Sequence, residues 1–129
     1  MTSDLDDQAL LRVAVATGGW ATRPDRRRKT FVTVTGRRFH LRTYEGKSDD
    51  WFFGVNKRFW DPAEWFLLAC GGPPAFFVLP VEKLNKFDFP FHKDDRKLHV
   101  VLNHGRWILR DPNPPIPINE YRDAFELLQ

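Results

Sequence analysis

Basic side chains gather in one stretch of this 129-residue chain, from Arg23 to Arg42. The stretch contains eight lysine and arginine residues and a single acidic residue, Asp25, whereas the whole chain has a net charge of only +3. The remainder of the chain is therefore net acidic. A local basic patch on an acidic protein is typical of phosphate recognition, so the pattern predicts DNA or another nucleic acid as partner. The alternative is a solvated arginine-rich turn that has no partner.

The segment Arg38–Tyr44 alternates in the way a strand with one buried face does. One face carries Phe39, Leu41 and Thr43, and the other carries Arg38, His40, Arg42 and Tyr44. We expect the cationic face, together with the basic run that precedes the neighbouring strand, to follow a phosphate backbone. The predicted phosphate-binding residues are Arg26, Arg27, Arg28, Lys29, Arg38, His40 and Arg42.

Aromatic rings interleave with cations in the next part of the chain. Trp51 and Trp60 lie on either side of Lys57 and Arg58, and this mixture suits stacking on unpaired bases together with phosphate contacts. Two alternatives stay open. The rings are the core of a small domain, or the segment Trp51–Trp65 is a protein–protein interface, where Trp, Phe and Arg are enriched.

Other chemical signatures are weak in this sequence. The four histidines show no metal-ligand spacing, and no glycine-rich phosphate loop or nucleophile elbow is present. The sequence therefore predicts no cofactor, with Mg²⁺ required only if the protein is a nuclease. The lone Cys70 lies in an apolar run and is expected to be a buried hydrophobe. An acidic N-terminus and the lack of a long apolar stretch predict a cytoplasmic protein without a membrane partner.

The elements that must position these residues are read from periodicity and from glycine and proline. Asp4–Thr17 is expected to be a helix that ends at Gly18-Gly19. The expected strands are Thr30–Thr35, Arg38–Tyr44, Trp51–Asn56, Trp65–Cys70 and Ala75–Leu79, followed by a hairpin of Leu98–Leu102 and Arg106–Leu109. Helices are expected at Val81–Phe87 and Glu120–Leu128. A helix at Glu64–Cys70 is the alternative to the fourth strand.

This order predicts a single α+β domain spanning residues 1–129. Its strands are expected to form one central mixed β-sheet of about five to seven strands, flanked by the N-terminal and C-terminal helices. The two apolar runs, Trp65–Cys70 and Ala75–Leu79, are expected at the centre of that sheet with both faces covered.

The same order resembles the PD-(D/E)XK nuclease fold over about residues 4–84. The similar stretch is WFFGVNKRFWDPAEWFLLACGGPPAFFVLPVEKL, Trp51 to Leu84, in which two apolar strands are separated by a short turn and the second ends in proline before a helix. The resemblance implies a site in which an Asp and a Glu-x-Lys hold divalent cations and position a water molecule. The strand that matches the family's Glu-x-Lys strand carries His40 and Arg42 at those positions, so the resemblance implies a degraded catalytic centre.

A literal copy of the motif exists elsewhere, as Pro24-Asp25 followed by Glu45-Gly46-Lys47. It makes Asp25, Glu45 and Lys47 the candidate catalytic residues of a Mg²⁺-dependent DNA endonuclease. Three hypotheses result: a DNA-binding domain without catalysis, which the basic patch favours; a metal-dependent nuclease; and a protein-interaction module. Whether the protein is an enzyme is left open, as is its oligomeric state.

Overall fold

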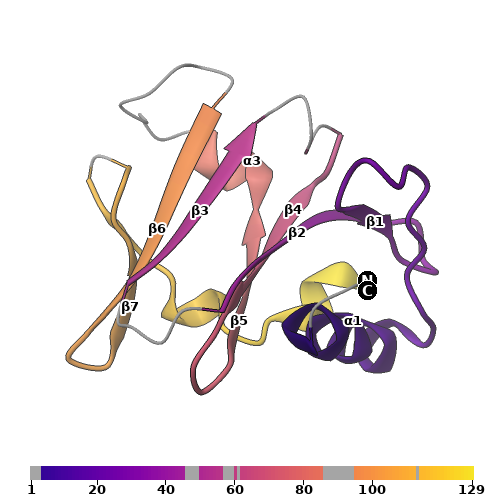
Figure 1. Cartoon of the computed structure of the whole chain (residues 1–129), viewed down its shortest axis with the longest axis horizontal. Coiled ribbons are helices and arrows are strands. Elements are labelled where there is room, and N and C mark those ends of the chain that lie inside the picture. Colours follow the sequence, from indigo (N-terminus) through magenta and orange to yellow (C-terminus); the bar gives the residue numbers. More distant parts are fainter. Residues whose placement is uncertain (1–3, 46–49, 57–59, 61, 86–94, 113) are drawn as a thin grey trace.

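The computed structural model describes residues 4–45, 50–56, 60, 62–85, 95–112 and 114–129. In these residues the chain forms an α+β domain with two four-stranded sheets. Figure 1 shows how the elements are arranged. The α+β class is confirmed, whereas the expected single sheet of five to seven strands is divided into two. None of the described helices is long and apolar enough to span a membrane.

The N-terminal helix α1 spans Asp4–Thr17, the range that the sequence predicts. Leu5, Ala9 and Val13 recur every four residues and are buried, so one stripe of the helix faces the protein. Acidic residues in the first turn favour the positive end of the helix dipole. The helix ends at Gly18, whose φ of 88° lies in the left-handed region that glycine adopts without strain.

The first sheet has the strand order β1-β2-β4-β5. The strands are β1 (Thr30–Val32), β2 (Arg38–Tyr44), β4 (Trp65–Cys70) and β5 (Ala75–Pro80). The strands β2 and β4 are parallel, and the other two pairs are antiparallel. The alternative of a helix over Glu64–Cys70 is wrong, because this segment pairs along its whole length with β2 and β5.

The second sheet is antiparallel with the order β3-β6-β7-β8. The strands are β3 (Asp50–Asn56), β6 (Asp95–Asn103), β7 (Arg106–Leu109) and β8 (Ile116–Pro117). A single sheet does not form because both edges of β2 are already paired, with β1 and with β4. The strand β3 follows β2 in the chain, but β2 has no unpaired edge left for it. The strand β3 pairs with β6 instead.

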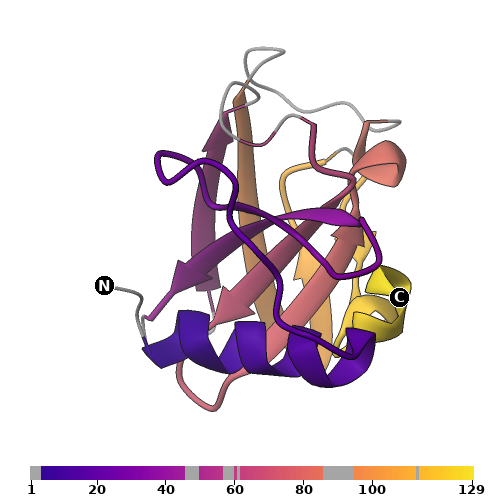
Figure 2. The same ribbon diagram turned by 90° about the vertical axis from the view of Figure 1, so that its right-hand side faces the viewer.

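The sheets and the helix form three layers, visible in Figure 2, where α1 lies across the first sheet and the second sheet stands behind it. Alternate residues of β4 show both interfaces. Leu67 and Ala69 pack in the core under α1, whereas Phe66, Leu68 and Cys70 pack in the core between the sheets. The predicted burial of β4 and β5 on both faces is confirmed, but the central position predicted for both is wrong for β5, which is the last strand of its sheet. Cys70 is fully buried, and burial raises the pKa of its thiol to about 12.

Two short helical segments replace the expected C-terminal helix Glu120–Leu128. They are the 3₁₀ turns η1 (Asn119–Tyr121) and η2 (Phe125–Leu128). Between them Arg122 is extended and bridges to Phe77, and Asp123 adopts a φ of 56° while its amide donates to the Phe76 carbonyl. The apolar residues of this segment, Tyr121, Ala124, Phe125 and Leu128, are buried, but pairing with the edge of β5 breaks the helix.

The remaining expected elements are found with small shifts. The short helix α3 spans Val81–Leu84, inside the expected range of Val81–Phe87, whose last two residues lie outside the described chain. The hairpin of β6 and β7 turns at His104 and Gly105, which both have positive φ, 51° and 77°. Positive φ at both central residues defines the type I′ turn that suits the twist of a two-residue hairpin.

Candidate nucleic-acid interface

The basic run that precedes β1 forms a structured loop, here called the arginine loop (residues 23–28). Main-chain pairing fixes its ends, because Thr22 pairs with Val32 and the Lys29 carbonyl accepts from the Leu41 amide at 2.8 Å. Inside the loop, the Arg23 guanidinium donates to the carbonyls of Arg26 and Arg28 and lies 5.8 Å from the Phe31 ring centroid. Arg23 therefore holds the loop from within.

Asp25 shapes the same loop. Its carboxylate accepts from the Arg27 amide at 2.9 Å and pairs with the guanidinium groups of Arg27 and Arg28 at 3.2 and 3.8 Å. These contacts, first the hydrogen bond from the Arg27 amide, lower the pKa of Asp25 below its usual value. The side chain of Arg27 is 89% exposed, so the loop presents this cation to solvent while Asp25 orders the turn beneath it.

Lys29 has a structural role. Its ammonium lies 2.8 Å from the carboxylate of Asp6, a residue of α1 that is buried. This ion pair joins the helix to the start of β1, and it satisfies a carboxylate that would otherwise be costly to bury. The burial of Asp6 was not predicted from the sequence, because Asp4 and Asp7 beside it are typical of an acidic first turn that is exposed to solvent. Its position between the buried Leu5 and Ala9 was the available signal.

His40 does not belong to an exposed cationic face. It is 2% exposed, its Nδ1 lies 3.0 Å from the Thr30 hydroxyl, and its ring meets Phe66 edge-on. Burial, followed by the charges of Arg42 and Lys29, lowers the pKa of His40 to about 3. The residue is therefore neutral at pH 7, and its predicted role as a phosphate-binding cation is wrong. It is buried because the layer formed by the second sheet and Trp60 covers the middle of β2.

Arg38 and Arg42 emerge on either side of His40, so two pockets replace one continuous basic face. The first, the basic pocket, has a volume of about 230 Å³. It brings the arginine loop together with residues of β2 and β3. Its lining residues are Arg27, Arg28, Lys29, His40, Arg42, Gly54 and Asn56.

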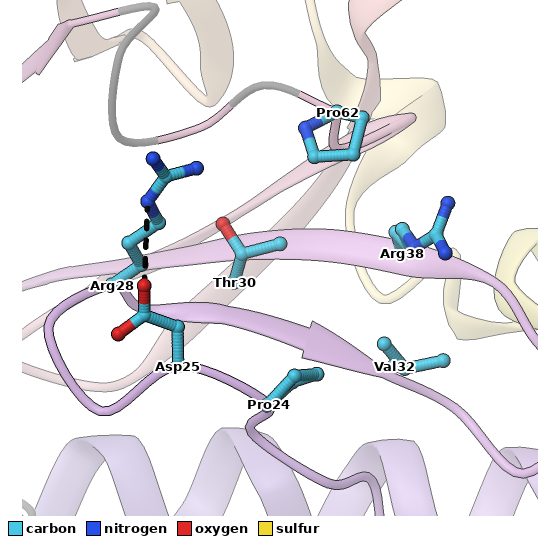
Figure 3. Close-up of a pocket in the computed structure, with 7 residues that line it drawn as sticks. All are labelled: Pro24, Asp25, Arg28, Thr30, Val32, Arg38 and Pro62. Atoms are coloured by element: carbon cyan, nitrogen blue, oxygen red, sulfur yellow. Dashed lines mark ion pairs between the residues drawn. The ribbon is translucent and has the colours of Figure 1, made fainter.

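Arg38 lines a second pocket, drawn in Figure 3 and here called the proline pocket. Its volume is about 300 Å³. It is lined by Pro24, Asp25, Arg28, Thr30, Val32, Arg38 and Pro62. Arg28 lines both pockets, and the pair formed by Thr30 and His40 connects the wall of one to the wall of the other.

The tryptophans expected to stack on bases lie in the core. Trp51 is 4% exposed, stacks near Trp107 with ring centroids 5.2 Å apart, and donates from its indole nitrogen to the Gly71 carbonyl. Trp60 is 5% exposed and meets Phe66 edge-on. Because both rings are buried, the prediction that they stack on bases is wrong, whereas a protein interface over Trp51–Trp65 stays a prediction. Lys57 and Arg58 lie outside the described residues.

Among the described residues the exposed rings are others, with Trp20 at 61% and Phe52 at 39% exposure. Gly54 and Asn56, which line the basic pocket, were also missed. Both follow from the alternation of β3, in which Trp51 and Phe53 point into the core, whereas Gly54 and Asn56 belong to the opposite face. Strand pairing does not bring these positions to the arginine loop, because β3 pairs with β6, and the two meet only at the basic pocket.

The candidate catalytic residues are not gathered in the described part of the chain. Asp25 is engaged by Arg27 and Arg28, whereas Glu45 follows the C-terminal end of β2, where its backbone lies against Gly71. Lys47 lies outside the described residues. In the ranges given above, no three His, Cys, Asp or Glu side chains are grouped so that they could hold a metal ion.

Comparison with known proteins adds no relative. No family model, no curated protein and no solved structure matches this chain.

Proposed function

We propose that this protein binds nucleic acid through its phosphate groups, at the basic pocket and the arginine loop, without catalysing a reaction there. The observation that carries the proposal is the convergence of Arg27, Arg28 and Arg42 from two elements on one pocket. Guanidinium groups in a fixed arrangement bind phosphate oxygens with charge-assisted hydrogen bonds, often two at a time.

The order of the loop supports the proposal. A flexible run of arginines loses conformational entropy when it binds, about 0.5–1.5 kcal/mol for each long side chain that becomes fixed. Here Arg23 and Asp25 already hold the backbone of the loop, so binding has to order only the ends of the exposed side chains. Arg26 and Arg27 are exposed, where the phosphates of a nucleic acid can reach them, and Arg42 is partly buried at the pocket.

A binding titration with single substitutions tests this function. Labelled single-stranded and double-stranded DNA of random sequence are titrated with the protein at low salt and without metal. An arginine that contacts phosphate adds to the affinity for DNA of any sequence. We therefore expect Arg27→Ala and Arg42→Ala each to weaken binding several-fold.

The matched control is Arg106→Ala, which removes the same charge from an exposed position at the start of β7. It lowers the net charge of the protein equally but lies in the second sheet, so we expect it to leave the affinity nearly unchanged. Equal losses in all three variants would reduce the effect to net charge alone. No binding of wild-type protein to either DNA at low salt would overturn the proposal.

The resemblance to the PD-(D/E)XK nuclease fold enters this proposal only as a possible scaffold. At the matching strand the chain has His40 and Arg42, one neutral and buried and one cationic, and neither residue replaces a carboxylate that binds Mg²⁺. Adding magnesium to the same samples tests the nuclease alternative, which requires cleavage that Glu45→Ala abolishes. We expect binding without cleavage.

A further inference from the structure

The proline pocket differs in character from the basic pocket beside it. Figure 3 shows Pro62 on one side, Pro24 and Val32 on the other, and Thr30 between them. The apolar walls are therefore formed by two proline rings and a branched aliphatic side chain. Polar groups lie at the rim, where Asp25 carries acceptors, Thr30 carries a hydroxyl and Arg38 carries donors.

Such a lining is typical of sites for small, flat, partly polar ligands, which are enclosed by apolar walls and oriented by a few polar groups. A volume of about 300 Å³ is at the lower end of ligand pockets, so the site takes one ring system rather than a large molecule. A phosphate alone would gain nothing from the two prolines and Val32. A purely aliphatic ligand would make no use of the guanidinium of Arg38 at the rim.

The position of the pocket relates it to the phosphate site. Arg28 lines both pockets, and Thr30 of one lies 3.0 Å from His40 of the other. The two pockets therefore share a wall. Within one nucleotide the base and the phosphate are joined through a single sugar ring, so adjacent pockets of opposite character suit the two ends of that unit.

We propose that the proline pocket receives one unpaired nucleobase of a single strand whose neighbouring phosphate occupies the basic pocket. This inference rests on the proposed function and adds to it a preference for unpaired over base-paired nucleic acid. A base in a duplex is stacked and paired, so it would have to be extruded first, at a cost of a few kcal/mol. The prolines and Val32 supply the contact with the faces of the base, and Asp25, Thr30 and Arg38 supply partners for its edge.

The test compares two single-stranded DNA hexamers with the same charge. One is a hexamer of thymidylate, and the other has the same sugar–phosphate backbone without any base. Both are titrated with wild-type protein and with Val32→Phe, whose ring would fill the pocket from β1. Contact with a base typically contributes about tenfold or more in affinity, so we expect wild-type protein to prefer the hexamer with bases about tenfold. We expect Val32→Phe to abolish that preference.

Three controls separate the possible failures. Val15→Phe adds the same ring to a position on α1 that is 77% exposed, and it should keep the preference. Unchanged binding of the baseless hexamer to Val32→Phe shows that this variant is folded with an intact basic pocket. Pro62→Phe, which fills the pocket from the opposite wall, repeats the test if Val32→Phe does not fold.

The outcomes distinguish the two proposals. Equal binding of both hexamers to wild-type protein, or a preference that survives in Val32→Phe and Pro62→Phe, overturns the base pocket but leaves phosphate binding in place. Absence of binding to both hexamers at low salt overturns phosphate binding, and the base pocket with it. A duplex that binds more tightly than the thymidylate strand also contradicts the base pocket.

Discussion

His40 shows how burial decides the chemistry of a residue. In the sequence it alternates with Arg38 and Arg42 and looks like a third cation, but the second layer of the fold covers it, whereas Arg38 and Arg42 lie toward the two ends of β2. A charged imidazole there would lose its hydration and would face the positive charges of Arg42 and Lys29. The residue is therefore a neutral hydrogen-bonding partner of Thr30.

The stability of the protein should consequently depend on pH through His40. Its pKa is about 3 in the folded protein against 6.5 in the unfolded chain, so the unfolded chain takes up the proton first as the pH falls. The stabilisation is fully present above pH 6.5 and is lost as the pH falls from 6.5 toward 3. At pH 5 the loss amounts to about 2 kcal/mol.

Urea denaturation of wild-type protein and of His40→Gln at pH 7 and pH 5 measures this loss. The glutamine variant is less stable at pH 7, because it replaces a packed ring, but it has no proton to take up. Its free energy of unfolding should therefore fall less between the two pH values. The same fall in both proteins would contradict a neutral, buried His40.

At the scale of elements, the sequence predicts well whatever depends on local pattern. The bounds of α1, β2 and β4 follow from the spacing of Leu5, Ala9 and Val13, from the alternation in Arg38–Tyr44, and from an apolar run bounded by glycine. The C-terminal helix fails because its residues pair with β5, a contact between positions more than 40 residues apart that no local pattern records.

The candidate site fails in part for the same reason. The alternation of β2 places Arg38, His40 and Arg42 on one face of the strand. Which of them is buried depends on the second sheet, which β3 joins instead of pairing with β2. Aromatic residues such as Trp51 are common both in protein cores and at binding surfaces, so their type alone does not tell which of the two they form. The basic run itself was recognisable, because charge in that density is excluded from the interior wherever it is not paired.

The hairpin of β6 and β7 offers a test of turn chemistry at this scale. His104 occupies the first left-handed position of a type I′ turn, where asparagine followed by glycine is preferred. We expect His104→Asn to stabilise the protein by about 0.5 kcal/mol and to raise its Tm by about 2 °C. Thermal unfolding followed by circular dichroism measures the change. A lower Tm for His104→Asn than for the matched β-branched variant His104→Val would contradict the turn assignment.

The whole molecule separates its charges along the chain. Eight of its basic residues belong to the stretch around β1 and β2, and the rest of the chain is net acidic. A polyanion should therefore approach in one orientation, with the arginine loop toward it and the acidic remainder away from it. Within the basic stretch, Lys29 is paired with Asp6, His40 is neutral, Arg23 and Arg37 donate to main-chain carbonyls, and Arg38 lines the proline pocket. This leaves Arg26, Arg27, Arg28 and Arg42 for phosphate.

This number of cations sets the expected dependence of binding on salt. Each phosphate that a cation neutralises releases bound counterions, and the logarithm of the binding constant then falls with the logarithm of salt concentration by about 0.9 per contact on duplex DNA and about 0.7 on a single strand. Four contacts give a slope of about −3 to −4. Titrations between about 50 and 200 mM salt, which span roughly physiological conditions, measure this slope.

Arg27→Ala should make the slope shallower by about one contact, whereas Lys29→Ala should lower the stability of the protein and leave the slope unchanged. A steep slope that Lys29→Ala reduces and Arg27→Ala does not would mean that the ion pair with Asp6 opens on binding, and that phosphate enters deeper than the arginine loop.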